Sequence, residues 1–215
     1  MVRHPSNKLS IWLTTDFCAP KWGGVETHSV QLASCLIERG HKVIMITNSY
    51  RGVRTGIRVL GNGMKVYHLP LLPIVDEDVA YPCFLLFNGV FRDIFIREHV
   101  DIVHGHLTTS ITAAMVLRAA ELLNIRYVMS EHSNYSFNEL GLLQVNKALK
   151  FYLCGVNATI AVSHASKDNF TLRAKVRPDQ CYVIPNAVDT DKFTPNPSLR
   201  FPLNSINIVH ISRLA

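Results

Sequence analysis

Residues 101–132 read DIVHGHLTTSITAAMVLRAAELLNIRYVMSEH, and this stretch decides the fold class. A short apolar run at 101–106 is followed by an alanine-rich segment at 110–123 and by a second apolar run at 127–132. Short apolar runs of this kind are typical of buried strands, and the segment between them is long enough for a helix. The stretch therefore predicts a strand, a crossover helix and a second strand parallel to the first.

The same alternation of short apolar runs and longer helical segments continues along the rest of the chain. Further strands are predicted at residues 9–17, 42–47, 65–69, 158–163 and 181–184, and further helices at 25–39, 82–99, 140–154 and 166–175. Gly40 is suited to end the first of these helices, and Ser163 to cap the start of the last one. Residues 51–63 are predicted to form a glycine- and arginine-rich loop, and residues 76–78 an acidic turn. The pattern predicts an α/β fold: a Rossmann-like parallel sheet with helices on both faces.

One domain accounts for most of the chain. Residues 9–190 are predicted to form it, because no earlier segment has the composition of a linker. Residues 191–205 contain three prolines and are interpreted as an interdomain linker. The apolar run at 206–211 predicts a new strand. Since one strand cannot form a domain, residues 206–215 are interpreted as the start of a second domain that is truncated in this chain.

The composition restricts the class of protein. Hydrophobic residues make up 48% of the chain and charged residues 18%, which excludes a disordered or fibrous protein. The net charge of +6 suits an anionic partner, either acidic lipid or a nucleotide diphosphate. The basic residues are scattered and no RNA-binding motif or zinc finger is present, so no nucleic acid partner is predicted. Five scattered cysteines indicate a reducing compartment, and no segment has the roughly 20 apolar residues of a membrane span.

A pair of glycines follows the first predicted strand and precedes the first predicted helix. Gly23 and Gly24 would let the backbone approach a ligand closely, and the helix N-terminus favours a phosphate. A plain loop is the alternative interpretation. The segment is not the G-x-G-x-x-G dinucleotide motif and no Walker lysine follows, which disfavours a dehydrogenase or an NTPase.

Histidines follow the two strands of the deciding stretch. His104 and His106 lie on one face of their strand, because side chains alternate along a strand. For the same reason only one of Glu131 and His132 can face a cleft. A metal site would need three or four convergent ligands, which His104, His106 and His132 could supply. We instead expect no metal, with the histidines hydrogen-bonding a polyol or a phosphate, and a packed structural role remains open for His104.

The motifs together resemble the retaining glycosyltransferases of family 4, which have the GT-B fold of two Rossmann-like domains. The matching motifs occur in the family's order: Gly23-Gly24-Val25-Glu26-x-His28, His104-x-His106, Glu131-His132-Ser133, Ala161-Val162-Ser163, residues 184–189 (IPNAVD) and Ser212-Arg213-Leu214. Residues 40–70 are also similar to the catalytic subunits of the phosphatidylinositol N-acetylglucosaminyltransferases, which begin glycosylphosphatidylinositol-anchor synthesis. The similarity extends over residues 9–215.

The resemblance implies transfer of N-acetylglucosamine from UDP-GlcNAc to phosphatidylinositol at the cytosolic face of the endoplasmic reticulum membrane, within a complex of several subunits. It implies that Gly23 and Gly24 approach the donor diphosphate and that His132 is catalytic, hydrogen-bonding the donor sugar or the reacting centre. It also implies that His106, Glu131 and Arg213 bind substrate, with Arg213 on the diphosphate. No cofactor is implied.

Other interpretations remain open. The family's Lys-Gly pair and Glu-x₇-Glu segment lie beyond residue 215, so this chain alone is expected to be inactive. A non-catalytic, truncated α/β module of a membrane complex is one alternative, and another family 4 lipid glycosyltransferase, such as a mannosyltransferase, is a second. We also predict peripheral membrane contact through the basic, apolar helices at 82–99 and 140–154.

Overall fold

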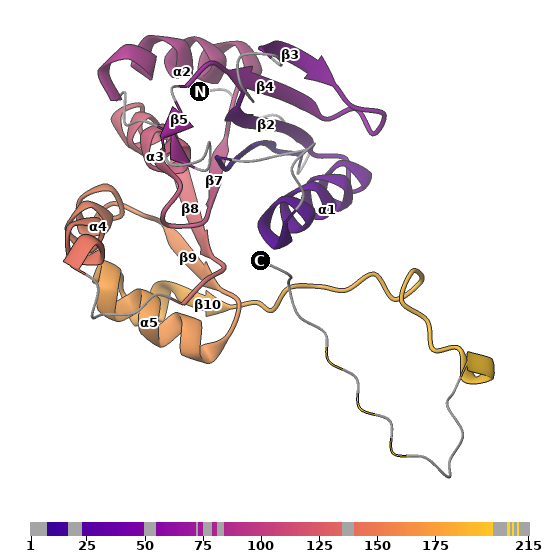
Figure 1. Cartoon of the computed structure of the whole chain (residues 1–215). Helices are drawn as coiled ribbons and strands as arrows, with labels where there is room; N and C mark the ends of the chain where they lie inside the picture. Colours follow the sequence, from indigo (N-terminus) through magenta and orange to yellow (C-terminus); the bar gives the residue numbers. More distant parts are fainter. Residues whose placement is uncertain are drawn as a thin grey trace.

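The computed structural model describes most of the chain. The described residues are 8–16, 23–49, 55–71, 73–74, 79–80, 84–134, 140–199, 206, 208 and 210. Within them an eight-stranded sheet has the order β10-β9-β8-β7-β1-β2-β4-β3, and all neighbouring strands are parallel except the edge strand β3. The predicted α/β fold with a Rossmann-like sheet is therefore confirmed (Figure 1).

Strands and helices alternate through most of the chain. The strands of the large sheet are β1 (Ser10–Thr14), β2 (Lys42–Asn48), β3 (Gly56–Val59), β4 (Lys65–Leu69), β7 (Ile102–His106), β8 (Arg126–Glu131), β9 (Ala158–Ala161) and β10 (Cys181–Val183). A separate two-stranded ribbon consists of β5 (Pro73–Ile74) and β6 (Val79–Ala80). The helices are α1 (Gly24–Glu38), α2 (Phe84–Glu98), α3 (Ile111–Leu122), α4 (Leu140–Tyr152) and α5 (His164–Ala174), with 3₁₀ turns at Pro178–Gln180 and Pro197–Leu199.

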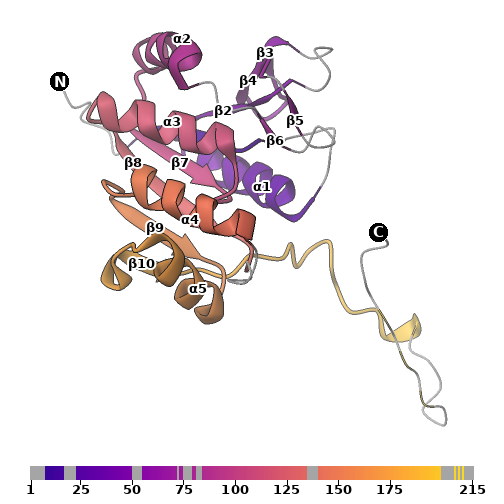
Figure 2. The ribbon, with the colours of Figure 1, turned by 60° about the vertical axis from the view of Figure 1, so that its left-hand side comes forward.

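The helices form two layers on the faces of the sheet. Ile11 and Leu13 of β1 pack with Ala33 of α1, while Trp12 between them packs on Phe91 and Phe95 of α2. This alternation is the period of two that a strand imposes on its side chains. In Figure 2, α3 and α4 lie in front of the strands and α1 lies behind them. Side chains of β7 and β8 that face α1 can therefore reach that helix.

The strand order changes direction at β1, and this change indicates where a ligand-binding crevice is expected. β2 and β4 lie on one side of β1, whereas β7, β8 and β9 follow in sequence on the other side. In open α/β sheets a crevice forms outside the carboxyl ends of the strands at such a switch point. The segments after β1, β7 and β8 meet there.

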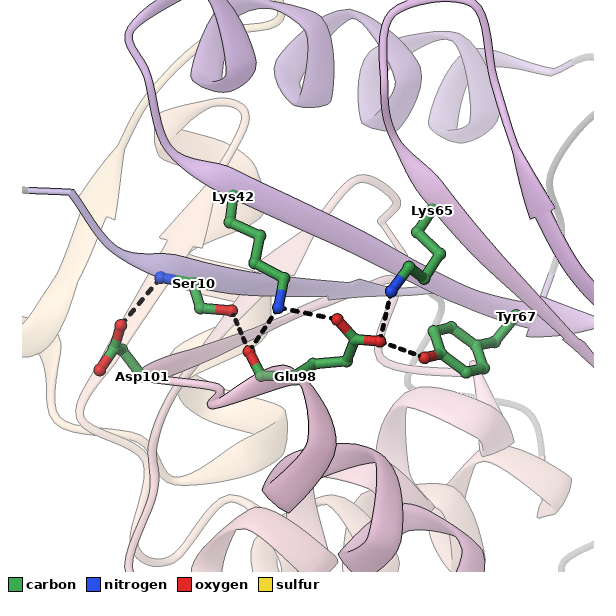
Figure 3. Close-up of polar contacts among 6 residues, drawn as sticks. All are labelled: Ser10, Lys42, Lys65, Tyr67, Glu98 and Asp101. Atoms are coloured by element: carbon green, nitrogen blue, oxygen red, sulfur yellow. Dashed lines mark hydrogen bonds and ion pairs between the residues drawn. The ribbon is translucent and has the colours of Figure 1, made fainter.

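A polar cluster joins the opposite, amino-terminal edge of the sheet to the end of α2 (Figure 3). The carboxylate of Glu98, which is only 1% exposed, pairs with Lys42 Nζ at 2.8 Å and Lys65 Nζ at 2.6 Å and accepts a hydrogen bond from the Tyr67 hydroxyl. Ser10 Oγ donates to the Glu98 carbonyl at 2.9 Å, and Ser10 N donates to Asp101 Oδ2 at 2.8 Å. The cluster fixes the starts of β1, β2 and β4 relative to α2.

Two parts of the chain differ from the sequence predictions. Residues 51–63 were expected to be loop, but β3 forms there and pairs antiparallel with β4. The predicted strand at 206–211 is described only at 206, 208 and 210, which have no regular structure and where Ile206 is 94% exposed. The predicted acidic turn at 76–78 lies outside the described residues, and the division into a domain at 9–190 and a linker stays a prediction.

Candidate functional site

The first turn of α1 is open to a ligand. Gly23 is the N-cap and provides no side chain to accept a hydrogen bond from the first-turn N–H groups. Those groups and the helix dipole together favour an anion. A Cβ on Gly24 would meet no atom within 4 Å, whereas a Cβ on Gly23 would stand 2.4 Å from Glu26 Oε2. Gly24 therefore faces free space, and Gly23 leaves room for the Glu26 carboxylate.

That free space belongs to a pocket of about 450 Å³ between α1 and the segment that follows β10. The pocket is lined by Gly23, Gly24, Thr27, His28, Gln31, Asn186 and Ala187. Asn186 and Ala187 belong to the residues 184–189 that the sequence analysis compared with family 4. The N-terminus of α1 and this distant segment thus form one pocket.

Three histidines from three elements meet beside the pocket. His106 is the last residue of β7 and is fully buried, His132 follows β8, and His28 lies one turn into α1. His106 Nδ1 and His132 Nε2 are 3.2 Å apart, a hydrogen-bonding distance. The ring centroid of His28 is 4.8 Å from that of His132 and 5.5 Å from that of His106. The side chains of His106 and His132 thus lie together, and His28 connects them to the pocket at Gly24. That His106, His132 and Gly24 serve one substrate site stays a prediction.

Burial keeps the histidines of this cluster neutral. It lowers the pKa of His132 from 6.5 to about 4, with a further lowering by neighbouring His28 and an opposing effect of Asn186. Burial also lowers the pKa of His28, and it holds the pKa of His106 well below 6.5. Near neutral pH the cluster therefore offers uncharged imidazoles, which donate or accept hydrogen bonds according to their tautomer.

His104 has a different environment from the other three histidines. Its Nε2 lies 2.7 Å from Ser130 Oγ on the neighbouring strand, and its ring packs against His106 at a centroid distance of 4.2 Å. Between the two histidines, a Cβ on Gly105 would stand 3.0 Å from Met129 Sδ and 3.3 Å from Leu117 Cδ1. The glycine thus permits close packing of α3, and the ring of His104 packs against the ring of His106.

Glu131 points away from the pocket. The residue is fully buried, its carboxylate accepts a hydrogen bond from the Thr108 hydroxyl, and its Oε1 accepts from the backbone N–H groups of His132 and Ser133 at 2.9 and 3.0 Å. The expectation that only one of the two adjacent residues faces the cleft is confirmed, and that residue is His132. Contrary to the role implied for it as a substrate ligand, Glu131 is used inside the protein, where it holds the turn that carries His132.

Asp16 plays a comparable part after β1. Its two carboxylate oxygens accept hydrogen bonds from the N–H groups of Ile111 and Thr112 at 3.1 and 2.9 Å, which caps α3 from a distant part of the chain. Burial raises the pKa of Asp16, while these hydrogen bonds oppose the shift. The contact fixes Asp16, just after β1, against the start of α3, which follows the segment after His106.

Of the predicted site residues, the structure brings together Gly23, Gly24, His106 and His132, and it turns Glu131 inward. Arg213 lies outside the described residues. His28 was quoted in a motif but was not predicted as a site residue. Its position four residues after Gly24 could have identified it, because residues i and i+4 share one face of a helix.

Comparisons with known proteins agree with this architecture. Residues 22–192 match the family model of Glycosyltransferase Family 4. A human phosphatidylinositol N-acetylglucosaminyltransferase subunit is 44% identical over 207 residues, covering 95% of this chain and 42% of the relative. Its namesake from Arabidopsis thaliana is 39% identical over 207 residues, covering 96% and 46%. The chain thus spans less than half the length of these relatives.

Solved structures share the fold at low sequence identity. A glycosyltransferase from Rickettsia africae superposes with a TM-score of 0.63 at 20% identity, covering 92% of this chain and 47% of that one. Anabaena HepE, solved in complex with UDP, superposes with a TM-score of 0.61 at 18% identity, covering 88% and 47%. The sheet order, the open N-terminus of α1 and the family match agree: this chain belongs to glycosyltransferase family 4.

Proposed function

We propose that this chain supplies the acceptor-side domain of a retaining glycosyltransferase that transfers N-acetylglucosamine from UDP-GlcNAc to phosphatidylinositol, the first step of glycosylphosphatidylinositol-anchor synthesis. The carrying observation is the cluster of His28, His106 and His132 beside the pocket at the start of α1. The names of relatives up to 44% identical support the choice of substrates.

The arrangement suggests a separate role for each residue of the site. The first-turn N–H groups of α1 at Gly24 face open space and suit the diphosphate of the donor. His132 is neutral near pH 7, so it acts as a hydrogen-bonding group toward the donor sugar or the reacting centre rather than as a cation. His106 fixes the ring of His132 through their hydrogen bond. Arg213 is assigned to the diphosphate, since a guanidinium suits phosphate.

The acceptor is a membrane lipid, so the domain must meet a bilayer. Among the described residues, no helix is long and apolar enough to cross one. We assign peripheral contact to the outer surface of α2 and α4, at the cytosolic face of the endoplasmic reticulum and beside other subunits of the transferase. Among the side chains of these helices that the structure describes, Val90, Ile96 and Phe151 are 40%, 55% and 63% exposed, while the core takes up Phe91, Ile94, Phe95, Leu149 and Tyr152.

A chimera tests the proposal in a complete enzyme. Residues of the human relative that align with this chain are replaced by the chain, and membranes containing the chimera receive UDP-GlcNAc. We expect N-acetylglucosaminyl-phosphatidylinositol to form. The substitution His132→Ala in the chimera is expected to lower turnover by roughly 100-fold, the usual effect of removing one hydrogen-bonding group at a reacting centre.

His164→Ala is the matched control, because His164 is exposed at the start of α5, and it should leave turnover unchanged. A chimera that is stably expressed but forms no product would contradict the proposal and favour a non-catalytic module. Glycosylation of a different lipid would instead favour another family 4 lipid glycosyltransferase.

A further inference from the structure

The three histidines beside the pocket have the spacing of metal ligands. Each contributes a ring nitrogen that lies within 4.8 Å of ring nitrogens of the other two. Two nitrogens that share a tetrahedral zinc at 2.0–2.1 Å stand about 3.3 Å apart. His106 Nδ1 and His132 Nε2 are 3.2 Å apart, so this pair already has the required separation.

His28 can complete the set. It must approach by roughly 1.5 Å to reach the separation of ligands in a tetrahedral zinc site. The side chain is half-buried and borders the pocket, so a change of rotamer has space to occur. The sequence offered His104 as the third possible ligand, but its Nε2 forms a hydrogen bond with Ser130 Oγ instead.

Two further observations bear on binding of a cation. His106 Nε2, the ring nitrogen that would not bind the ion, is buried without a hydrogen-bond partner among the described residues, so no other contact fixes the tautomer of this ring. The pocket gives the ion a way in and leaves a fourth coordination position for water.

We propose that His28, His106 and His132 form a binding site for a divalent transition-metal ion of the zinc type. Imidazole nitrogens suit Zn²⁺, Co²⁺ and Cu²⁺ and are poor ligands for Mg²⁺. The ion would replace the hydrogen bond between His106 and His132, so the metal-bound form is an alternative to the form in which His132 contacts the donor. Metal binding itself does not depend on the proposed function.

Calorimetric titration of the chelator-treated 215-residue chain with Zn²⁺ tests the site. We expect one ion per chain with a dissociation constant of about 10 μM or lower, and no heat with Mg²⁺. His28→Gln and His132→Gln should each weaken binding by about tenfold or more, because a glutamine of similar size removes one nitrogen ligand. His164→Gln, on an exposed histidine, should change nothing.

Cobalt gives a second measurement that needs no substitution. Co²⁺ bound by three imidazoles should show the visible bands of four- or five-coordinate cobalt, and Zn²⁺ should remove them. A near-ultraviolet thiolate band would assign the ion to the exposed Cys35 or Cys154 and overturn the proposal. The absence of saturable binding, or unchanged binding in both His→Gln variants, would overturn it as well.

Discussion

At the residue scale, Gly24 is a position where an effect on ligand binding can be distinguished from an effect on stability. A methyl group at this position meets no atom within 4 Å, and alanine suits a helix better than glycine. We expect Gly24→Ala to keep or slightly raise the free energy of unfolding but to lower turnover of the chimera by about tenfold or more, since the methyl group enters the space of the bound donor.

The matched control is Gly89→Ala. Gly89 is also a helical glycine at which an added methyl group would meet no atom within 4 Å, but it lies on α2, away from the pocket. It should leave turnover unchanged. Equal activity of Gly24→Ala and Gly89→Ala would show that the start of α1 does not approach the donor. Thermal unfolding of both variants separates a loss of binding from a loss of folding.

Glu98 shows how one buried carboxylate supports the other edge of the sheet. Lys42 and Lys65 lower its pKa from 4.5 to about 2 against the opposing effect of burial. Because the pKa is lowered in the folded state, the stabilisation is complete above pH 4.5 and is lost as the pH falls toward about 2. Glu98→Gln should therefore lower the free energy of unfolding at neutral pH by about 2 kcal/mol, since both lysines are partly exposed.

Urea unfolding over this pH range checks the expectation: the difference between wild type and Glu98→Gln should shrink as the pH falls. The burial of Asp16 and Glu131 acts in both proteins and cancels in the difference. Asp179→Asn removes an ion pair of exposed side chains with Arg177 and should have no measurable effect. A difference that is constant with pH would mean that the charge of Glu98 does not stabilise the fold.

Residues at strand ends are the ones whose positions could be predicted from the sequence. His106 and His132 each lie at the carboxyl end of a strand, so the sheet brings them together whatever the details of packing. The inward orientation of Glu131 could not be predicted in this way, because the hydrogen bond from Thr108 depends on the loop before α3. That Asn186 lines a pocket together with α1 depends on the path of the segment after the last strand, which no local pattern encodes.

At the level of secondary structure, the outer surface of α2 and α4 decides whether the domain meets a bilayer. Flotation with phosphatidylinositol-containing vesicles at low salt should carry the chain upward, and added salt should weaken the binding because basic side chains contribute. Ile96→Glu and Phe151→Glu should each reduce flotation. Phe151 is a good target, because Arg118 stands 5.2 Å from its ring centroid and joins charge to an exposed aromatic side chain.

Val59→Glu is the control for these substitutions. Val59 is 67% exposed on β3, and its replacement by glutamate changes the net charge by the same amount. It should float like the unmodified chain. If the unmodified chain stays at the bottom of the gradient at low salt, the assignment of a membrane-facing surface to α2 and α4 is wrong.

Elements with a clear apolar run were predictable, down to the three-residue strand β10, and the exposed strand β3 was not. The helices and the parallel strands carry enough apolar residues to show their periods, and the serine predicted to cap α5 does so: Ser163 Oγ accepts from Ser166 N at 3.1 Å. β3 is missing from the prediction because its alternation of Ile57, Arg58 and Val59 is short and lies in a glycine- and arginine-rich segment, and all four of its residues are exposed. Only pairing with β4 makes this segment a strand.

For the whole molecule, the predicted domain boundary can be tested by limited proteolysis. Residues 184–199 lie outside the sheet and are mostly exposed, with Phe193 at 68%. Trypsin or chymotrypsin should cut first within 189–205 or within 51–63 and leave a core of about residues 9–190. Mass spectrometry identifies the fragments. A stable fragment that ends near residue 100 would contradict a single domain.

The polar cluster at the amino-terminal edge of the sheet also has a consequence for the rates of folding and unfolding. Ser10 and Asp101 are 91 residues apart, and their hydrogen bond closes a loop over nearly half of the chain. During synthesis β1 leaves the ribosome long before α2 and Glu98, so Lys42 and Lys65 must remain in water until then. Closing so long a loop has a large entropic cost, so we expect the contact to form after the transition state. Interactions absent from the transition state act mainly on the rate of unfolding. The Glu98 cluster should therefore determine how long the finished domain stays folded, and have little influence on how quickly it first folds.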